Sequence, residues 1–583
     1  MRVEGGRRNR LLSGDFSSDI LAQERGTRRK RWAGHLPVAL IFPNSYRVAA
    51  SNLGFQLVYQ LLNRHPALVA ERFVLSPPGS PPRSLESNRP LSDFSLICYS
   101  LSFEGDTLEL LRLLAAGGVE IDAARRGEDQ PLVLGGGVAT WMNPEPLAVA
   151  TDLFLIGEAE AMLDPLLTPL IEYLLSSPRP MKEELLHRLA ADFPGCYAPR
   201  FYRPRYHRDG RVAEVEVSDG LPKRIKPVLL HDPAVAGYSR LLSPLAEFSD
   251  LFLVELGRGC SRGCRFCAAG FIYRPPRRWS SAAIAAALAQ IPEGVTRVGL
   301  LGMEMTDRAT LDEISQRIAA IGCKLSFSSL RADALTPELL SLLGSSGVKS
   351  AVLAPDGASQ RLRRIINKNL AEEDILQAAE ALTQTGIGTL KLYCMLGLPE
   401  EGEEDLEELV EMLGRLRKNL LVSGRARGRL TEIQLSVSSF VPKPWTPFQY
   451  HPFAGVAPLR KRLQFLRRKL SAQANLSLRA ESPEHAHWQA LLARGDRRMG
   501  EALLRVAVAP GGGNPRQQLR KLGLDTDWYS QRLRGGDELM PWEIIDPGLA
   551  PGYLFAEYQK GLGGDSTPPC PERGCGRCGV CLP

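Results

Sequence analysis

Short apolar runs alternate with amphipathic segments between residues 36 and 175, and this rhythm predicts a strand–helix repeat. Four runs are typical of buried strands: PVALIF (37–42), FSLICYSLS (94–102), PLVLGGG (131–137) and DLFLIG (152–157). Two segments between them, FQLVYQLLNRH (55–65) and LELLRLLAAGG (108–118), have the apolar spacing of helices. Repeated strand–helix units predict an α/β domain with a doubly wound parallel sheet. The glycines 135–137 follow a strand, where a backbone can approach a ligand closely.

A second strand–helix repeat covers residues 250–475 and predicts a partial (β/α)6 barrel. Its expected strands are FLVEL (252–256), RVGLLG (297–302), LSFSSL (325–330), SAVLAP (350–355), TLKLYCML (389–396) and EIQLSVSSF (432–440). In parallel barrels the chemistry lies at the carboxyl ends of the strands. The remaining segments are a basic arm (1–35), a bridge with a predicted β-hairpin (176–249) and an irregular C-terminal region (476–583).

Composition places the chain among soluble globular proteins of two to four domains. Of its 583 residues, 44% are hydrophobic and 23% are charged. No apolar run approaches the roughly 20 residues of a membrane span, and the first residues lack the apolar core of a signal peptide. We therefore expect a cytoplasmic protein without a membrane partner.

The formal net charge is +7, which is compatible with a nucleic-acid partner. Residues 460–470, RKRLQFLRRKL, place basic and apolar side chains on roughly opposite faces of a helix. This pattern is equally typical of an ordinary solvated surface helix.

Seven of the eleven cysteines fall into two tight groups, which in a cytosolic protein indicate metal sites before disulfides. The first group is CxxxCxxC, placed after the first barrel strand: Cys260, Cys264 and Cys267. Three thiolates can hold three corners of a [4Fe–4S] cluster and leave the fourth iron free for chemistry. Zinc is the alternative, but it would need a fourth ligand, and the nearest histidines are His231 and His451.

With Phe266 before its last cysteine, this loop resembles that of the radical S-adenosylmethionine (SAM) superfamily. The resemblance implies that Cys260, Cys264 and Cys267 are catalytic cluster ligands. It implies that the open iron binds the amino and carboxylate groups of SAM. A reduced cluster would then cleave SAM to a 5′-deoxyadenosyl radical, with electrons from a donor such as flavodoxin or ferredoxin.

Other strand ends carry segments similar to those of the same family. The resemblance implies contacts to SAM from Phe266, Gly302, Glu304, Arg331, Asp333, Asp356, Gly397 and Pro399. Gly302 and Glu304 would contact the SAM amine, although Met303 departs from the usual Gly-Gly-Glu. Arg331 and Asp333 would lie near the SAM carboxylate or ribose, with a structural ion pair as the alternative. Asp356 replaces a more usual Glu, and Gly397 and Pro399 would shape the adenine pocket.

The N-terminal domain resembles the cobalamin-binding-like domain that precedes the barrel in one radical SAM group. GGGVATWMNPEP (135–146) and DLFLIGEAEA (152–161) carry the likeness, but the ligating pattern D-x-H-x-x-G is absent. We therefore favour a degenerate domain that packs or presents substrate over one that binds cobalamin. The C-terminal stretches SPEHAHWQALLARGDRRMGE (482–501) and CPERGCGRCGVC (570–581) extend the resemblance to an uncharacterised subfamily with this domain order. The resemblance then covers nearly the whole chain beyond the basic arm.

The second cysteine group closes the chain with the spacing C-x4-C-x2-C-x2-C: Cys570, Cys575, Cys578 and Cys581. Four thiolates suit a second iron–sulfur cluster or a tetrahedral zinc ion. The ferredoxin-like spacing favours the cluster.

These patterns predict a radical SAM enzyme that modifies a macromolecule, RNA ahead of protein, by methylthiolation or methylation. Methylthiolating relatives usually carry three cysteines in the N-terminal domain, whereas this chain has only Cys98 and Cys196 there. A cobalamin-dependent radical SAM methylase is one alternative. A non-catalytic iron–sulfur or zinc protein that binds RNA or acts as a scaffold is the other.

Overall fold

The N-terminal sheet confirms the predicted α/β class. In the computed structural model, which describes residues 16–77, 79–249, 251–302, 308–327, 330–426, 428–510, 513–571 and 574–581, its strand order is β2-β1-β3-β4-β5-β6. All neighbours are parallel except β5 and β6. The strands are β1 (Leu36–Ile41), β2 (Leu68–Phe73), β3 (Leu96–Ser100), β4 (Leu132–Gly136), β5 (Leu153–Leu155) and β6 (Cys196–Tyr197).

Helices pack on this sheet in two groups. Helix α4 (Leu53–Arg64) packs with α7 (Ala159–Leu175), whereas α5 (Thr107–Ala116) packs with the C-terminal helix α18 (Arg497–Val508). The sheet itself continues to β6, beyond the residue 175 at which we expected this domain to end.

Strand β2 is fully buried although it contains Glu71 and Arg72, which break the apolar pattern that reveals its neighbours. Arg72 forms ion pairs with Glu24 and Glu86, each at 2.6 Å, and all three side chains are buried. Because a buried charge needs a partner, these two carboxylates allow Arg72 to be buried on this edge strand of the sheet.

All six expected barrel strands are present, in two parallel sheets of order β13-β12-β9 and β14-β15-β16-β17. A parallel bridge from Leu330 to Leu353 joins the two sheets. The strands are β9 (Phe252–Glu255), β12 (Arg297–Leu301), β13 (Lys324–Phe327), β14 (Ser350–Asp356), β15 (Thr389–Leu396), β16 (Glu432–Ser439) and a seventh, β17 (Leu476–Ala480), which the sequence analysis did not predict.

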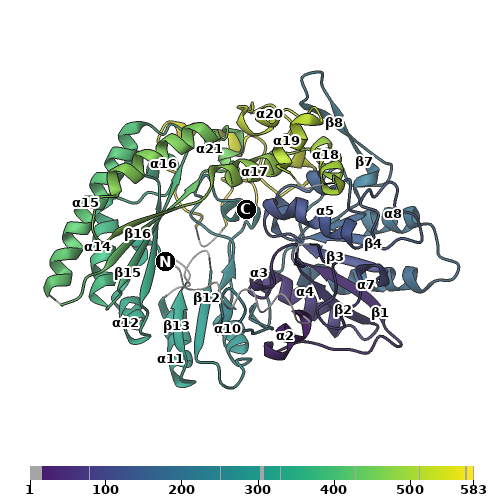
Figure 1. Cartoon of the computed structure of the whole chain (residues 1–583), viewed down its shortest axis with the longest axis horizontal. Helices are drawn as coiled ribbons and strands as arrows, with labels where there is room; N and C mark the ends of the chain where they lie inside the picture. The colour runs from purple at the N-terminus through teal and green to yellow at the C-terminus, as the bar shows by residue number, and fades with distance from the viewer. Residues whose placement is uncertain are drawn as a thin grey trace.

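Helices cover one face of the barrel strands, and the opposite face turns toward the interior of the molecule (Figure 1). The covering helices are α10 (Ser281–Leu288), α11 (Arg308–Ala320), α12 (Pro337–Ser345), α14 (Glu372–Gln384), α15 (Glu403–Ala426) and α16 (Val456–Leu470). The predicted hairpin is β7 (Tyr202–Tyr206) with β8 (Val212–Val217).

The C-terminal region lies along the barrel and the N-terminal domain and contacts both (Figure 1). It consists of α17 (Pro483–Arg494), α18, α19 (Pro515–Lys521), α20 (Thr526–Gln531) and α21 (Tyr553–Leu562), followed by the cysteine tail. Helix α17 packs on β16, and α18 packs on α5. Among the helices in the described ranges, none has both the length and the apolar character of a membrane span.

Candidate functional site

The three-cysteine loop is closed by a short antiparallel ribbon that follows β9. Its strands β10 (Gly257–Arg258) and β11 (Arg277–Arg278) pair at the two ends of the loop. Gly259 and Gly263 have φ of +86° and +67°, in the region that favours glycine. A Cβ at Gly259 would lie 2.7 Å from the Tyr273 carbonyl oxygen, so this turn needs glycine.

The three cysteines of the loop are partly buried. The Cys267 amide donates to the Cys264 carbonyl at 3.0 Å, which folds the CRFC segment into a turn. Burial raises the pKa of Cys264 to about 11, against the opposing charge of Lys368, and burial also raises the pKa of Cys267. Three thiols on one loop are the donor set that a [4Fe–4S] cluster with one open iron requires, and binding iron would release their protons.

Arg265, between the cysteines, was not singled out by sequence reasoning, although it lies inside the motif. Its side chain is fully buried. The guanidinium donates to the Ile365 carbonyl at 3.0 Å and to the Asp565 carbonyl at 2.7 Å. Arg265 therefore ties the loop both to the end of α13 (Gln360–Ile365) and to the segment after α21.

Asn367 is a second residue that sequence reasoning passed over, even though it lies in APDGASQRLRRIINK (354–368), the segment in which Asp356 replaces the family's more usual Glu. It adopts φ of +57°. Its amide nitrogen donates to the carbonyls of Arg262 and Gly263, each at 3.3 Å, and to that of Thr567 at 3.0 Å. Its side-chain oxygen accepts from the Thr567 amide at 2.9 Å.

Three of the predicted SAM contacts are linked by polar contacts, and two of them, Arg331 and Asp356, act electrostatically on Cys264. Arg331 forms an ion pair with Asp333 at 2.6 Å and donates to the Lys368 carbonyl at 2.6 Å. Asp356, at the end of β14, pairs with Lys368 at 2.6 Å. Burial raises the pKa of Asp356, and the Lys368 ammonium opposes this. The ion pair that was the alternative for Arg331 and Asp333 is present, and their contact with SAM stays a prediction.

The other predicted contacts lie in the three-cysteine loop and after neighbouring strands. Phe266 is half-buried against the core, and Gly302 is exposed after β12. Glu304 lies outside the described residues.

Gly397 and Pro399 form a buried turn after β15. In this turn the Gly397 amide donates to both carboxylate oxygens of Glu401 at 3.0 Å. A Cβ at Gly397 would lie 3.0 Å from both Ala454 and Leu459, so close packing explains this glycine. A role in binding adenine stays a prediction.

The four tail cysteines line a single cavity of about 280 Å³, directly beside the three-cysteine loop. The cavity wall also includes Ser261, Arg274 and Arg278. Burial raises the pKa of Cys570, while the Arg274 guanidinium lowers it. No three of the described His, Cys, Asp and Glu side chains are grouped to bind one metal ion together. The thiolates that bind an iron–sulfur cluster need not meet at one point, because each binds a different iron.

Two glycines of the N-terminal run, Gly135 and Gly137, pack closely against other parts of the protein. A Cβ at Gly135 would lie 2.3 Å from the Tyr99 hydroxyl, and one at Gly137 would lie 2.4 Å from the Leu101 carbonyl oxygen. The residues after this run face the barrel loop, since Trp141 contacts Tyr273 edge-on at 4.9 Å. Close packing therefore explains Gly135 and Gly137, and a domain that does not bind cobalamin stays a prediction.

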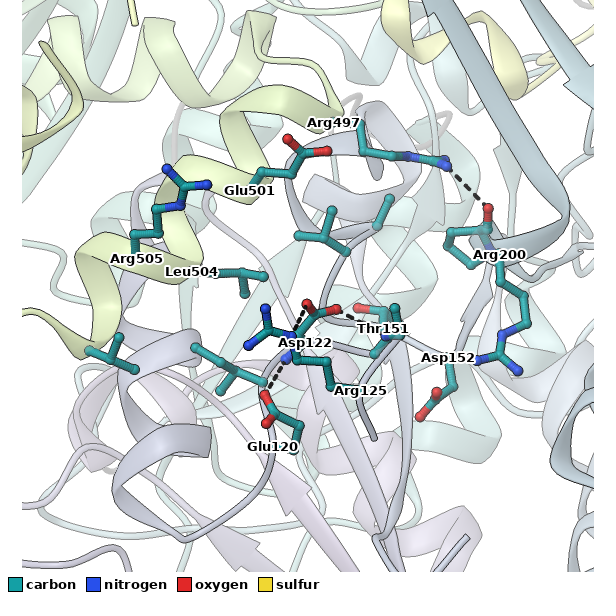
Figure 2. A pocket seen from close by; sticks show the side chains of 17 residues that line it. Glu120, Asp122, Arg125, Thr151, Asp152, Arg200, Arg497, Glu501, Leu504 and Arg505 are labelled. Atoms are coloured by element: carbon teal, nitrogen blue, oxygen red, sulfur yellow. Dashed lines mark hydrogen bonds and ion pairs between the residues drawn. The ribbon is translucent and has the colours of Figure 1, made fainter. Parts of the chain in front are cut away.

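A larger cavity, of about 590 Å³, lies away from both cysteine groups (Figure 2). It is bounded by residues 120–125, by residues 148–152 before β5, and by α18, whose Glu501 and Arg505 Figure 2 shows above Asp122. Among its charged side chains, Arg125 pairs with Asp122 at 3.4 Å and Arg497 pairs with Glu145 at 3.1 Å. None of its lining residues comes from the barrel, so it is separate from the cysteine chemistry.

Comparison with known proteins matches two parts of the chain to family models. Residues 54–199 match the model described as radical SAM proteins, N-terminal, and residues 254–413 match that of the radical SAM superfamily. An uncharacterised protein of Methanocaldococcus jannaschii, MJ0966, is 26% identical over 471 residues, which are 80% of this chain and 90% of that protein.

Two solved structures show weaker likenesses. The cobalamin-dependent SAM radical enzyme OxsB, with aqua-cobalamin and SAM bound, gives a TM-score of 0.41 at 14% identity, over 91% of this chain and 80% of that chain. Coproporphyrinogen III oxidase (HemN) of Escherichia coli gives 0.28 at 15% identity, over 38% and 52%. At these TM-scores we draw nothing from them about ligands or reaction.

Proposed function

The chain belongs to the radical SAM superfamily and is an enzyme that cleaves SAM; on this premise we propose that it modifies a macromolecule, RNA ahead of protein. Cys260, Cys264 and Cys267 would hold the [4Fe–4S] cluster. When bound, the reduced cluster supplies an electron to the SAM sulfonium. The protein's own part is to hold the loop rigid through Arg265 and Asn367 and to place charged groups beside it.

The observation that supports a macromolecular substrate is the open inner face of strand β15. Leu390, Leu392 and Cys394 are buried, whereas the alternate residues are less covered. Among them, Tyr393 keeps 42% of its surface exposed. Helices α14 and α15 cover the other face of these strands (Figure 1), so Tyr393 points into the barrel.

An exposed tyrosine beside a lysine suits a nucleobase. Lys391 and Tyr393 lie two residues apart on the same strand face. Unpaired bases stack on aromatic side chains in most single-stranded RNA sites, and a neighbouring cation adds attraction for phosphate. We propose that Tyr393 stacks on the target base or on a base next to it.

The outer surface supplies further positive charge. Helix α16 buries its four leucines and keeps Arg467, Arg468 and Lys469 exposed in its last turn. In the first half of the helix, Arg460 pairs with Glu484 and Lys461 with Glu403. The last turn is therefore the part of this helix that we assign to phosphate contacts.

Methylation or methylthiolation is the reaction that we propose for this enzyme. A second iron–sulfur cluster at Cys570, Cys575, Cys578 and Cys581 would complete the cofactor set, with zinc as its alternative. A cobalamin-dependent methylase remains the competing reaction class, and cobalt analysis of the purified protein decides between them. An electron donor such as flavodoxin or ferredoxin would supply the reducing equivalents.

The substrate class can be tested with the anaerobically reconstituted full-length protein, dithionite and methyl-labelled SAM. We expect total cellular RNA to stimulate 5′-deoxyadenosine formation and to acquire label. Tyr393→Ala should lower RNA-stimulated turnover about tenfold, because a base–aromatic stack is worth about 1–3 kcal/mol. Tyr393→Phe, which keeps the ring, should restore it. Label that appears in protein and survives ribonuclease treatment would contradict an RNA substrate.

A further inference from the structure

The two cysteine groups, about 300 residues apart in sequence, meet at one wall. The Cys570 amide donates to the Ser261 carbonyl at 2.8 Å, so the first tail cysteine is hydrogen-bonded to the residue after Cys260. Ser261 lines the same cavity of about 280 Å³ as all four tail cysteines. The three-cysteine loop is thus one side of the tail cavity.

Buried polar contacts hold this arrangement behind the cavity. Asn367 bonds the Gly263 carbonyl on the loop and both backbone groups of Thr567 on the tail. The Arg265 guanidinium donates to the Asp565 carbonyl at 2.7 Å. On the far side, the Cys578 carbonyl accepts from the Ala550 amide at 2.8 Å. These contacts hold residues 565–567 and Cys578 in place, and none of them involves a thiol.

A buried cation separates the two groups. Arg274 is 6% exposed and donates to the Gly270 carbonyl at 2.7 Å and to the Tyr553 hydroxyl at 3.1 Å. A Cβ at Gly263 would lie 3.4 Å from an Arg274 nitrogen, so the guanidinium reaches the three-cysteine loop. The same side chain lines the tail cavity and acts electrostatically on Cys570 and Cys578. No carboxylate lines this cavity among the described residues.

We propose that the four tail cysteines bind an iron–sulfur cluster in this cavity, in contact with the three-cysteine loop. Four cysteine thiolates give such a site a net negative charge, which the buried Arg274 and the neighbouring Arg278 offset. One zinc ion would draw all four sulfurs to about 2.3 Å from a single centre. Thiols spread around a cavity of about 280 Å³ instead suit a centre in which each thiolate binds its own iron.

Because the two cysteine groups share one wall, clusters bound to them would interact magnetically. The inference rests on the proposed function in two respects, that the three-cysteine loop holds its own cluster and that the tail cysteines hold a second one; it adds that the two clusters lie against one wall. Two reduced paramagnetic clusters on opposite sides of the Ser261–Cys570 hydrogen bond would broaden each other's electron paramagnetic resonance signals. Removal of either cluster would leave the narrower signal of the other.

The test uses the full chain, reconstituted anaerobically with iron and sulfide, and compares the wild type with three variants. C575S/C581S removes two tail ligands and leaves the Ser261–Cys570 contact in place. C260A/C264A/C267A removes the loop ligands. C323S is the matched control, because Cys323 is a partly exposed free thiol outside both groups. Iron, sulfide and zinc are counted per chain, and spectra are recorded after dithionite reduction.

We expect about eight irons in the wild type and in C323S, and about four in each of the other two variants. The wild-type spectrum should be broadened, and both four-iron variants should give simple signals. About four irons and one zinc in the wild type, with the zinc lost in C575S/C581S, would overturn the cluster. Eight irons with unbroadened electron paramagnetic resonance signals would contradict the proposal that the two clusters share one wall. Loss of all iron in C260A/C264A/C267A would overturn the tail site while leaving SAM cleavage by the wild type intact.

Discussion

At the scale of single residues, the polar groups that organise the site are not its metal ligands. Asn367 hydrogen-bonds both the three-cysteine loop and the tail, and Arg265 reaches from the loop to the tail through a hydrogen bond to Asp565 and an ion pair with Glu557 at 3.5 Å. Asn367 is 3% exposed and satisfies four backbone groups on two chain segments. Asparagine suits this position doubly, since it also tolerates a positive φ.

Replacing Asn367 by alanine should destabilise the protein by about 2–4 kcal/mol, because buried backbone partners lose their hydrogen bonds. It should also reduce the iron retained by the three-cysteine loop after reconstitution. Denaturant unfolding and iron counting measure the two effects. Asn369→Ala is the matched control: Asn369 also has a positive φ, of +51°, but within the described residues its side chain hydrogen-bonds only to Asn367, at 3.1 Å. Equal losses in both variants would show that backbone strain, and not bridging, is what matters.

At the scale of elements, the strands and the cysteine loop were predictable because their signals are local. Apolar runs reveal the six barrel strands, and glycines between cysteines reveal a tight turn. Strand β2 escaped prediction because Glu71 and Arg72 interrupt its pattern, and their partners lie elsewhere in the chain. Strand β17 has the sequence LSLRA, and this alternation of apolar and polar residues is too short to predict a strand.

The two loop glycines should respond differently to alanine. Gly263→Ala should cost about 1–2 kcal/mol for its φ of +67°, while its new methyl group would make ordinary contacts, 3.4 Å from Arg274 and 3.8 Å from Asn367. Gly259→Ala adds a 2.7 Å approach to a backbone oxygen, so the turn itself must shift. We expect Gly263→Ala to keep most of the loop's iron and Gly259→Ala to lose it. Iron content and the thermal midpoint of each reconstituted variant provide the measurement, and the reverse order would refute this assignment.

At the scale of the whole molecule, buried ion pairs lock the N-terminal domain onto the barrel. Glu158, after β5, holds Arg277 through two bonds of 2.8 Å and lies 3.3 Å from Arg258. Sequence reasoning predicted both domains but not this contact, because a pairing across about 120 residues leaves no local pattern. The contact between the tail and the three-cysteine loop could not be predicted either, because its partners are also far apart in sequence.

Glu158→Ala should therefore cost about 3–5 kcal/mol, since it leaves the buried Arg277 without its carboxylate. Glu160→Ala is the control: Glu160 is more exposed, and its partner Arg258 keeps Glu255, so about 1 kcal/mol is expected. Denaturant unfolding of both variants, with limited proteolysis of the 176–249 bridge, measures the difference. Similar small costs for both would mean that the domains are held together by apolar packing alone.

The central claim is that the three-cysteine loop makes this protein a radical SAM enzyme, and one assay tests it most directly. The wild type and C260A/C264A/C267A are reconstituted anaerobically, reduced with dithionite and given SAM together with total cellular RNA, and 5′-deoxyadenosine is quantified. We predict that the wild type forms 5′-deoxyadenosine and that the variant forms none, while the four tail cysteines retain about four irons in both proteins. Equal 5′-deoxyadenosine from the two proteins, or no binding of SAM by the fully loaded wild type, would contradict the claim.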